Sequence, residues 1–232
     1  MYGDVTRLKH IGSGDPSGSP MSKNEFQAVL GLRPKRNPAV LFSRMKRMSP
    51  LIRKFGEALN SGNGGRREWA TSRLAHLGHR SDTLLSLTIL HGEPMARAAA
   101  AEAVCKMIKL GLTDSYTREL STALDDDSPY VRWRALSEIG KAGRRVVRLT
   151  KELFSGLHDD SDLVRAQAAK AVAATYRVPR KSYQEDISDL RGLIKTEKDN
   201  YVRGEMGLAL VRLEKEYGRF GAKFLKTIGF KV

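Results

Sequence analysis

The sequence contains very little cysteine, few aromatic residues and no long apolar segment. Cys105 is the single cysteine among 232 residues, which excludes an internal disulfide framework and a cysteine-rich zinc module. No run of about 18 apolar residues is present, so no transmembrane helix and no membrane partner are expected. Aromatic residues make up 7% of the chain, while Ala, Leu and Arg recur throughout, and this composition favours helix.

Acidic residues are scarce relative to basic ones. The chain has 41 Lys and Arg against 26 Asp and Glu, a net charge of +15, and an anionic partner would explain this surplus. The N-terminus lacks the basic and then apolar start of a secretory signal, so we expect a reducing, cytoplasmic location. Hydrophobic residues make up 41% of the chain, which is enough for a packed core.

The basic surplus is concentrated near the N-terminus. Residues 1–56 contain 11 Lys or Arg and 3 Asp or Glu. Residues 1–20, rich in Gly, Ser and Pro, are typical of a flexible leader, either native or added. From residue 31 to residue 54 there are eight bases and no acid. The prolines in the first part of this stretch predict extended backbone, and the apolar spacing over residues 39–59 predicts helix.

A sequence unit of ~33 residues recurs along the rest of the chain. In each row an Arg follows a residue of the N-cap type by four positions, and small or apolar residues follow the Arg by three and seven positions. The row arginines are Arg67, Arg97, Arg132, Arg165 and Arg203. An amphipathic segment precedes each row, at 48–59, 82–90, 114–124, 146–157 and 186–194. The predicted unit is therefore helix A, a short acidic turn, helix B and a loop.

The rows at Arg132 and Arg165 both read D-D-x-x-x-V-R-x-x-A. This pattern resembles the short HEAT repeat of the PBS-lyase HEAT type, and the resemblance extends over residues 48–218. It implies an all-α solenoid of about five helix pairs, because a single pair cannot bury its apolar face. We expect a flexible leader and basic arm at 1–45, the repeat array at 46–218 and a basic tail at 219–232.

The resemblance implies a binding scaffold rather than a particular activity. Deoxyhypusine hydroxylases, alkylpurine DNA glycosylases and phycobilin lyases have similar repeats. No His-Glu dipeptide of the first family occurs here, and the chain is more basic than a pigment-handling role requires. Trp69 and Trp133 hold different places in their rows, which favours packing over a shared base-binding face. We expect no catalytic residue, metal site, cofactor or small-molecule substrate.

The row arginines are interpreted as structural. Each lies near the start of helix B, where its guanidinium can bond to the acidic turn of its own repeat or of an adjacent one. Cys105 follows a core-facing Val and is expected to be packed. The members assigned to this arginine ladder are Arg97, Arg132, Arg165 and Arg203.

The turns from helix A to helix B should all lie on one edge of the solenoid, and the loops from B to A on the other. The first edge is then acidic and the second basic, beyond what the helix dipoles require. We therefore expect the basic arm and the basic edge to bind the partner. The residues assigned to this role are Arg33, Lys35, Arg36, Arg44, Lys46, Arg47, Lys141, Arg144, Arg145, Arg148, Arg177, Arg180 and Lys181.

Two hypotheses about the partner remain open. In the first, the scaffold binds an anionic polymer, namely RNA, DNA or a ribonucleoprotein such as the ribosome. In the second, it is a protein–protein adaptor that holds a peptide or helix on its concave face. A nucleic-acid repair enzyme of the glycosylase kind is a weaker third alternative.

Overall fold

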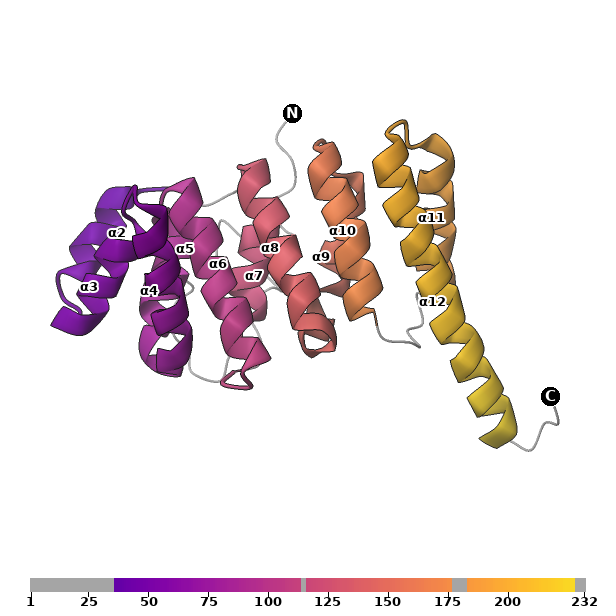
Figure 1. The fold of residues 1–232 in the computed structure, drawn as a ribbon, viewed down its shortest axis with the longest axis horizontal. Helices are drawn as coiled ribbons and strands as arrows, with labels where there is room; N and C mark the ends of the chain where they lie inside the picture. Colours follow the sequence, from indigo (N-terminus) through magenta and orange to yellow (C-terminus); the bar gives the residue numbers. More distant parts are fainter. Residues whose placement is uncertain (1–35, 114–115, 177–182, 228–232) are drawn as a thin grey trace, which may run out of the picture. The chain divides into compact units, whose positions relative to one another are not determined.

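The computed structural model describes residues 36–113, 116–176 and 183–227. Every regular element within these ranges is a helix, and the helices stack side by side in chain order (Figure 1). The predicted all-α solenoid is therefore confirmed for this part of the chain. None of the helices in the described ranges is long and apolar enough to cross a bilayer.

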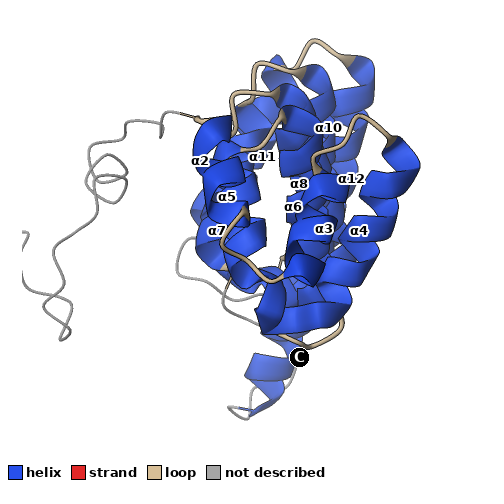
Figure 2. Ribbon diagram, turned by 90° about the vertical axis from the view of Figure 1, so that its left-hand side faces the viewer, coloured by secondary structure: helices blue, strands red, loops and turns tan. Residues whose placement is uncertain are grey.

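Helix pairs form the repeating unit. Figure 2 shows two layers, with α5 and α7 on one side and α8, α10 and α12 on the other. The A helices are α3 (Pro50–Leu59), α5 (Asp82–His91), α7 (Thr117–Leu124), α9 (Thr150–Ser155) and α11 (Tyr183–Thr196). The B helices are α4 (Gly64–Leu77), α6 (Pro94–Lys109), α8 (Pro129–Ala142), α10 (Asp162–Thr175) and α12 (Asn200–Thr227).

An additional helix, α2 (Pro38–Met45), precedes the first pair. It packs against α5 and buries Leu41 and Met45, which are 0% and 2% exposed. The array therefore begins before the predicted boundary at residue 46. A break at Ser49 separates α2 from α3, because Pro50 starts a new helix at its first position. The predicted start of a tail at residue 219 lies inside α12.

Polar residues at the helix starts bond to backbone N–H groups, though not always as the sequence predicts. The side chain of Asn63 accepts from Arg66 N at 3.0 Å, as an N-cap should. Ser128 occupies the same place before α8 but makes no such bond through its hydroxyl. Instead its own N–H donates to Asp126 Oδ1 at 2.9 Å. Asp126, two residues before Ser128, therefore accepts the hydrogen bond that caps this turn.

The core runs along the seam between the layers and between successive B helices. Small residues on the B helices allow neighbouring backbones to approach closely. An added Cβ at Gly140 of α8 would lie 3.5 Å from Ala171 Cα of α10, which is ordinary contact distance. Gly78 and Gly143 end α4 and α8 with φ of 56° and 63°, a conformation that glycine adopts readily.

The fourth A helix is less regular than the sequence predicts. The segment expected to be helical at 146–157 is divided among η3 (Gly143–Leu149), α9 and η4 (Gly156–His158). The two η segments are 3₁₀ helices, and a third, η2 (Gly78–Ser81), precedes α5. Gly156 lies where an added Cβ would come within 3.0 Å of Ala168 Cβ of α10. The close approach between α9 and α10 therefore depends on this glycine.

Candidate functional site

The turns from helix A to helix B carry three similar ion pairs. In each, the Nε and Nη2 atoms of a row arginine donate to the two oxygens of one carboxylate in the next turn along the chain. Bidentate pairing of this kind is among the stronger polar contacts in proteins. The N···O distances are 2.8 and 2.7 Å for Arg97 with Asp126, 2.7 and 2.8 Å for Arg132 with Asp159, and 2.7 and 3.0 Å for Arg165 with Glu197.

The third guanidinium nitrogen of each arginine bonds within its own turn. Arg132 Nη1 donates to the carbonyl of Asp126 at 2.7 Å, and Arg165 Nη1 donates to that of Asp159 at 2.9 Å. Each of these carbonyls lies six residues before its arginine. The guanidinium therefore ties its own turn to the following one. We call each such linkage between two turns a rung.

The rungs shift the pKa values of their acids. The hydrogen bond from Arg165 holds the pKa of Glu197 below its ordinary value, against the opposing effect of burial. For Asp159, burial is the largest effect and raises the pKa, yet the bonds from Arg132 and from the Ser161 N–H together lower it. These carboxylates are therefore held in the charged form that pairs with arginine.

The first of these rungs includes a second arginine. Asp126 is fully buried and binds both Arg97 and Arg36, with an Arg36 Nη2 to Oδ2 distance of 2.7 Å. Burial raises the pKa of Asp126 although Arg97 opposes the shift. The pKa of Asp127 is lowered to about 2, first by its hydrogen bond with Asp126 and then by the charges of Arg36 and Arg97. Arg36, assigned by sequence to partner binding, is thus engaged inside the fold.

The remaining predicted binding residues fall into three groups. Arg44, Lys46 and Arg47 lie on or just after α2 and are exposed. No ion pair or hydrogen bond involves their side chains within the described part of the chain. Outside the described residues lie Arg33, Lys35, Arg177, Arg180 and Lys181, together with the side chain of Arg148.

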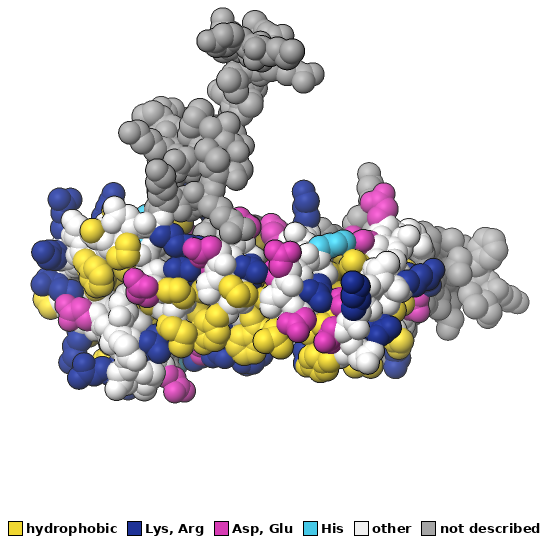
Figure 3. Space-filling model, turned by 90° about the horizontal axis from the view of Figure 1, so that it is seen from above, with side chains coloured by type: hydrophobic (Ala, Val, Ile, Leu, Met, Phe, Trp, Pro, Cys, Tyr) yellow, Lys and Arg dark blue, Asp and Glu magenta, His cyan; other side chains and the backbone are white. Residues whose placement is uncertain are grey.

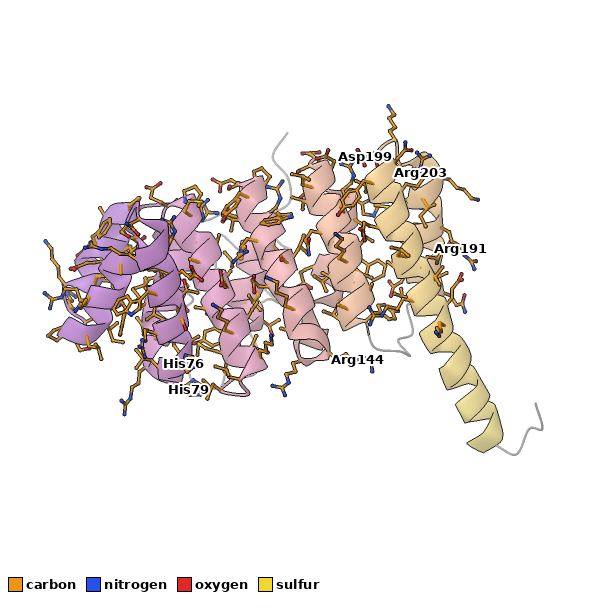
Figure 4. The ribbon with its side chains drawn as sticks, viewed as in Figure 1. His76, His79, Arg144, Arg191, Asp199 and Arg203 are labelled. Carbon is orange, nitrogen blue, oxygen red and sulfur yellow. The ribbon has the colours of Figure 1, made fainter. Side chains whose placement is uncertain are left out.

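The third group lies on the edge formed by the B-to-A loops. Lys141 donates to Glu138 at 2.8 Å, and Arg145 donates to the carbonyls of Ile108 and Lys109. Figure 4 shows Arg144 on this edge together with His76 and His79, opposite the edge that carries Asp199 and Arg203. The acidic and basic edges thus lie on opposite sides, as the repeat predicts.

A larger basic surface lies on the first repeat. Residues 36–81 contain 10 Lys or Arg and 2 Asp or Glu, whereas residues 82–215 contain 22 and 20. Figure 3 shows basic side chains gathered at the end of the row where α2 and α3 lie. Sequence reasoning did not select Lys54, Arg66 and Arg73 of this surface, all of them exposed.

Three exposed side chains form a line along α4. Arg66, Trp69 and Arg73 stand at positions i, i+3 and i+7, which share one face of a helix. Trp69 is 42% exposed, and its ring packs on that of Phe55 with centroids 5.0 Å apart. The predicted packing role of Trp69 therefore holds for only part of its surface. We call these three residues the α4 stripe, and their spacing was readable from the sequence.

The B helices also expose a row of large apolar side chains. Each lies two positions before a row arginine, so the members stand in register from helix to helix. Figure 3 shows hydrophobic side chains gathered along this side. This apolar row consists of Met95, Tyr130, Leu163 and Tyr201, which are 45%, 41%, 62% and 54% exposed.

Two further predictions concern the interior and metal binding. Cys105 is buried at 2% exposure, and burial raises the pKa of its thiol. Trp133 is half-buried and packs against the core, with its ring 6.1 Å from that of Tyr130. Among the described residues, no group of three or more His, Cys, Asp or Glu side chains is arranged to hold a metal ion.

Comparison with known proteins agrees with this architecture. Residues 117–211 match a family model described as HEAT repeats. Among solved structures, the chain is similar to one titled as the complex of CpcE and CpcF of phycocyanin lyase from Nostoc sp. PCC7120. The TM-score is 0.56 and the identity 18%, covering 68% of this chain and 96% of that one.

A designed armadillo repeat protein, YIII(Dq)4CqI, matches with a TM-score of 0.44 and 16% identity, covering 84% of this chain and 96% of its own. No curated protein matches the sequence. At these identities the solved structures bear on fold alone. The family match covers the rows in which the arginine and acid pattern is most regular, and it is consistent with a HEAT-repeat family.

Proposed function

We propose that the chain is a non-catalytic binding scaffold whose first repeat, α2 to α4, holds a single-stranded nucleic acid. The observation that carries this proposal is the α4 stripe, in which an exposed Trp lies between two exposed arginines without acidic partners. Proteins that bind single strands combine a basic surface with aromatic rings on which bases stack. Unpaired bases of a single strand are available for such stacking, while those of a duplex are not.

The location of the charge supports a binding role rather than general solubility. Exposed Lys and Arg side chains on α2 to α4 lack partners within the described residues, whereas the row arginines Arg97, Arg132 and Arg165 bond to acids. Neutralising phosphates releases condensed counterions, and this favours association of such a surface with a polyanion. The binding test below compares RNA and DNA strands and so decides which polymer is held.

The basic edge, formed by the B-to-A loops, continues the surface of the α4 stripe. The α4 stripe runs from the acidic edge toward the edge on which His76, His79 and Arg144 lie in Figure 4. A strand that follows α4 would therefore arrive beside His76 and His79, with Arg145 and then Arg144 further along the edge. These residues are secondary in the proposal, because Arg145 already donates to two backbone carbonyls. Lys141 is likewise bound to Glu138.

The test measures binding of fluorescent 12-nucleotide U and dT strands by anisotropy over a range of salt concentrations. For single strands the slope of log affinity against log salt is about −0.7 for each phosphate neutralised. The double variant Arg66→Gln, Arg73→Gln should therefore flatten the slope by about 1.4. Lys195→Gln, Lys198→Gln removes the same charge from exposed positions of the last repeat and serves as the matched control. Equal slopes in the two variants would contradict the proposal.

A protein partner is the second candidate, and the apolar row favours it. Four large apolar side chains at 41–62% exposure would be covered by the apolar face of a helix or peptide. The structure titled as the complex of CpcE and CpcF is a complex between two proteins. Incorporating a photo-crosslinker at Leu163 and at the unrelated exposed site Lys54 tests this candidate. A protein captured only from Leu163 would support it, and equal products from both sites would oppose it.

A further inference from the structure

The series of rungs is interrupted between the turn before α4 and the turn before α6. We call this place the first junction. In the rows of Arg97, Arg132 and Arg165, the acid that receives the guanidinium lies six positions before the next row arginine. The corresponding position for the row of Arg97 is residue 91, which is His91. The turn that faces Arg67 therefore has a histidine where the later turns have Asp or Glu.

Arg67 makes only the half of a rung that lies within its own turn. Its Nη1 donates to the carbonyl of Ser61, six residues earlier, as the Nη1 of Arg132 does with Asp126. Because this bond is shared with the other rows, we expect the Nε and Nη2 edge of Arg67 to face the next turn as it does in them. Within the described residues that edge has no hydrogen-bond or ion-pair partner, and Arg67 is half-buried.

The next turn does lie against the turn that precedes α4. An added Cβ at Gly92 would lie 3.2 Å from Asn60 Oδ1, so the two turns are in contact. His91 is 7% exposed, and its Nδ1 is buried without a hydrogen-bond partner. It lines a hollow of about 410 Å³ together with Arg36, Arg97 and Ser128.

The surroundings of His91 favour an anion at this junction. Burial, followed by the charges of Arg36 and Arg44, lowers the pKa of His91, so the ring stays neutral at pH 7. A neutral ring supplies no negative charge to offset Arg67. Asp126 and Asp127, the nearest acids of the following turn, are already bound by Arg36 and Arg97. The junction thus has an arginine fork and no carboxylate at the rung position, while Glu93 of the same turn is exposed.

We propose that the open rung at Arg67 is an oxyanion site, filled by a backbone phosphate of the strand that lies on the α4 stripe. This inference rests on the proposed function. Arg67 follows Arg66 directly on the first turn of α4, about 100° around the helix axis, so a strand with one phosphate at Arg67 reaches the α4 stripe through Arg66. The guanidinium edge that pairs bidentately with carboxylates in three later rows fits the oxygen pair of a phosphate equally well.

Filling the rung has a structural consequence. In the later rows one carboxylate joins each turn to the arginine before it, and at the first junction the bound phosphate takes that place. The strand therefore stabilises the contact between the first repeat and the second. Binding raises the melting temperature of wild-type protein by more than that of a variant whose rung is already complete.

The test uses His91→Asp, which supplies the missing carboxylate, and His91→Asn, a control of similar size without the charge. We expect His91→Asp to raise the melting temperature above that of His91→Asn. It should also flatten the salt slope for a 12-nucleotide strand by about 0.7, the value for one phosphate. Arg67→Gln should flatten the slope equally but lower the melting temperature by about 2–4 °C, since it removes the hydrogen bond to the Ser61 carbonyl.

Several results would overturn the inference. If His91→Asp melts no higher than His91→Asn, the predicted geometry of the rung is wrong. If Arg67→Gln binds the strand as wild type does, with an unchanged salt slope, no phosphate occupies the rung. Poly-glutamate that binds in an Arg67-dependent way, while the strand does not, would assign the site to an acidic protein instead.

Failure of the proposed function gives a separate pattern. In that case wild-type protein binds no strand at low salt, yet His91→Asp still melts above His91→Asn. The rung geometry then stands, and the phosphate as its occupant is rejected together with the nucleic-acid proposal. Supporting the inference requires both the stabilisation by His91→Asp and the matching loss of salt dependence in His91→Asp and Arg67→Gln.

Discussion

The first repeat and the repeats from α6 onward use the same row arginine differently. In the later rows Arg97, Arg132 and Arg165 are bound to an acid of the next turn, and bases and acids are nearly balanced. In the first repeat Arg67 bonds, within the described residues, to a backbone carbonyl and to no acid, and residues 36–81 contain 10 bases and 2 acids. Paired charge therefore joins repeats to one another, and unpaired charge is available to a partner.

The largest expected effect is the loss of a buried rung. Arg97→Met would leave Asp126, which is 0% exposed, with Arg36 as its remaining arginine partner. Breaking a buried ion pair by removing one partner costs about 3–5 kcal/mol, and the remaining Arg36 bond places our expectation near ~3 kcal/mol. Urea unfolding at pH 7 measures this change in the free energy of unfolding.

Arg67→Met is the matched control for that measurement. It removes an arginine at the same row position, but one without a carboxylate partner in the described residues. Its expected effect is about 1 kcal/mol, from the loss of the Arg67 hydrogen bond to the Ser61 carbonyl. Equal destabilisation by the two variants would remove the distinction between the first repeat and the later ones.

Acidification should weaken the later repeats through their rungs. The pKa of Glu197 is lowered by Arg165, and that of Asp127 is lowered to about 2. Groups with a depressed pKa in the folded state contribute stability above their unfolded pKa, and this stability is lost as the pH falls through the folded value. The melting temperature should therefore fall from about pH 4.5 toward pH 2, although Asp126, whose pKa is raised, opposes part of the loss.

Glu197→Gln identifies how much of this pH dependence comes from a single rung. The amide cannot ionise, so the variant should be less stable than wild type at pH 7 and should lose less stability on acidification. Thermal melts from pH 7 to pH 2.5 followed by circular dichroism give both quantities. A variant curve parallel to that of wild type would show that the acid sensitivity arises elsewhere.

Removing the ring of the α4 stripe should weaken binding, at a cost to folding of about 0.5–1.5 kcal/mol from the lost contact with Phe55. Stacking of a base on an aromatic side chain is worth about 1–3 kcal/mol, so Trp69→Ala should weaken strand binding by about tenfold. Met95→Ala removes an exposed apolar side chain from the apolar row and serves as the control. Loss of affinity in Met95→Ala alone would shift the interface from the first repeat to the B helices of the later ones.

The smallest expected effect concerns repulsion among unpaired bases. Lys54→Glu introduces an acid among exposed bases of the first repeat and should raise the free energy of unfolding by up to ~0.5 kcal/mol at low salt. Lys141→Glu, at a residue paired with Glu138, should lower it by a similar amount. Salt should reduce both differences. Effects of the same sign would show that the two regions do not differ in this respect.

The sequence predicted the repeat and its contacts because both depend on short, regular spacings. The residues three and seven positions after each row arginine define one helix face, and four of the five pairs of Ala and aliphatic residues at these positions are found in the core. The acids six positions before Arg132 and Arg165 were recognised as an acidic turn, which placed them within reach of arginine. These relations need no information about distant parts of the chain.

The candidate site was harder to predict from the sequence, for a physical reason. Arg36 appeared as one base in an acid-free stretch, but its partner Asp126 is 90 residues away in the chain. A count of charges within a short segment does not reveal a partner that is distant in the sequence. The α4 stripe and the histidine at position 91 were visible as spacings, yet their meaning depends on exposure and on contact between two turns, which only the fold provides.

The single thiol of the chain has a practical consequence. Cys105 lies on α6, fully enclosed between the second and third repeats, and burial keeps it protonated. A thiol reagent can reach it only when that part of the array opens, so the labelling rate in native buffer records local opening at one position. Because no second cysteine competes for the reagent, the native protein already contains a site-specific kinetic probe. Comparing labelling rates with and without a bound partner would show how far stabilisation at the first repeat spreads along the array.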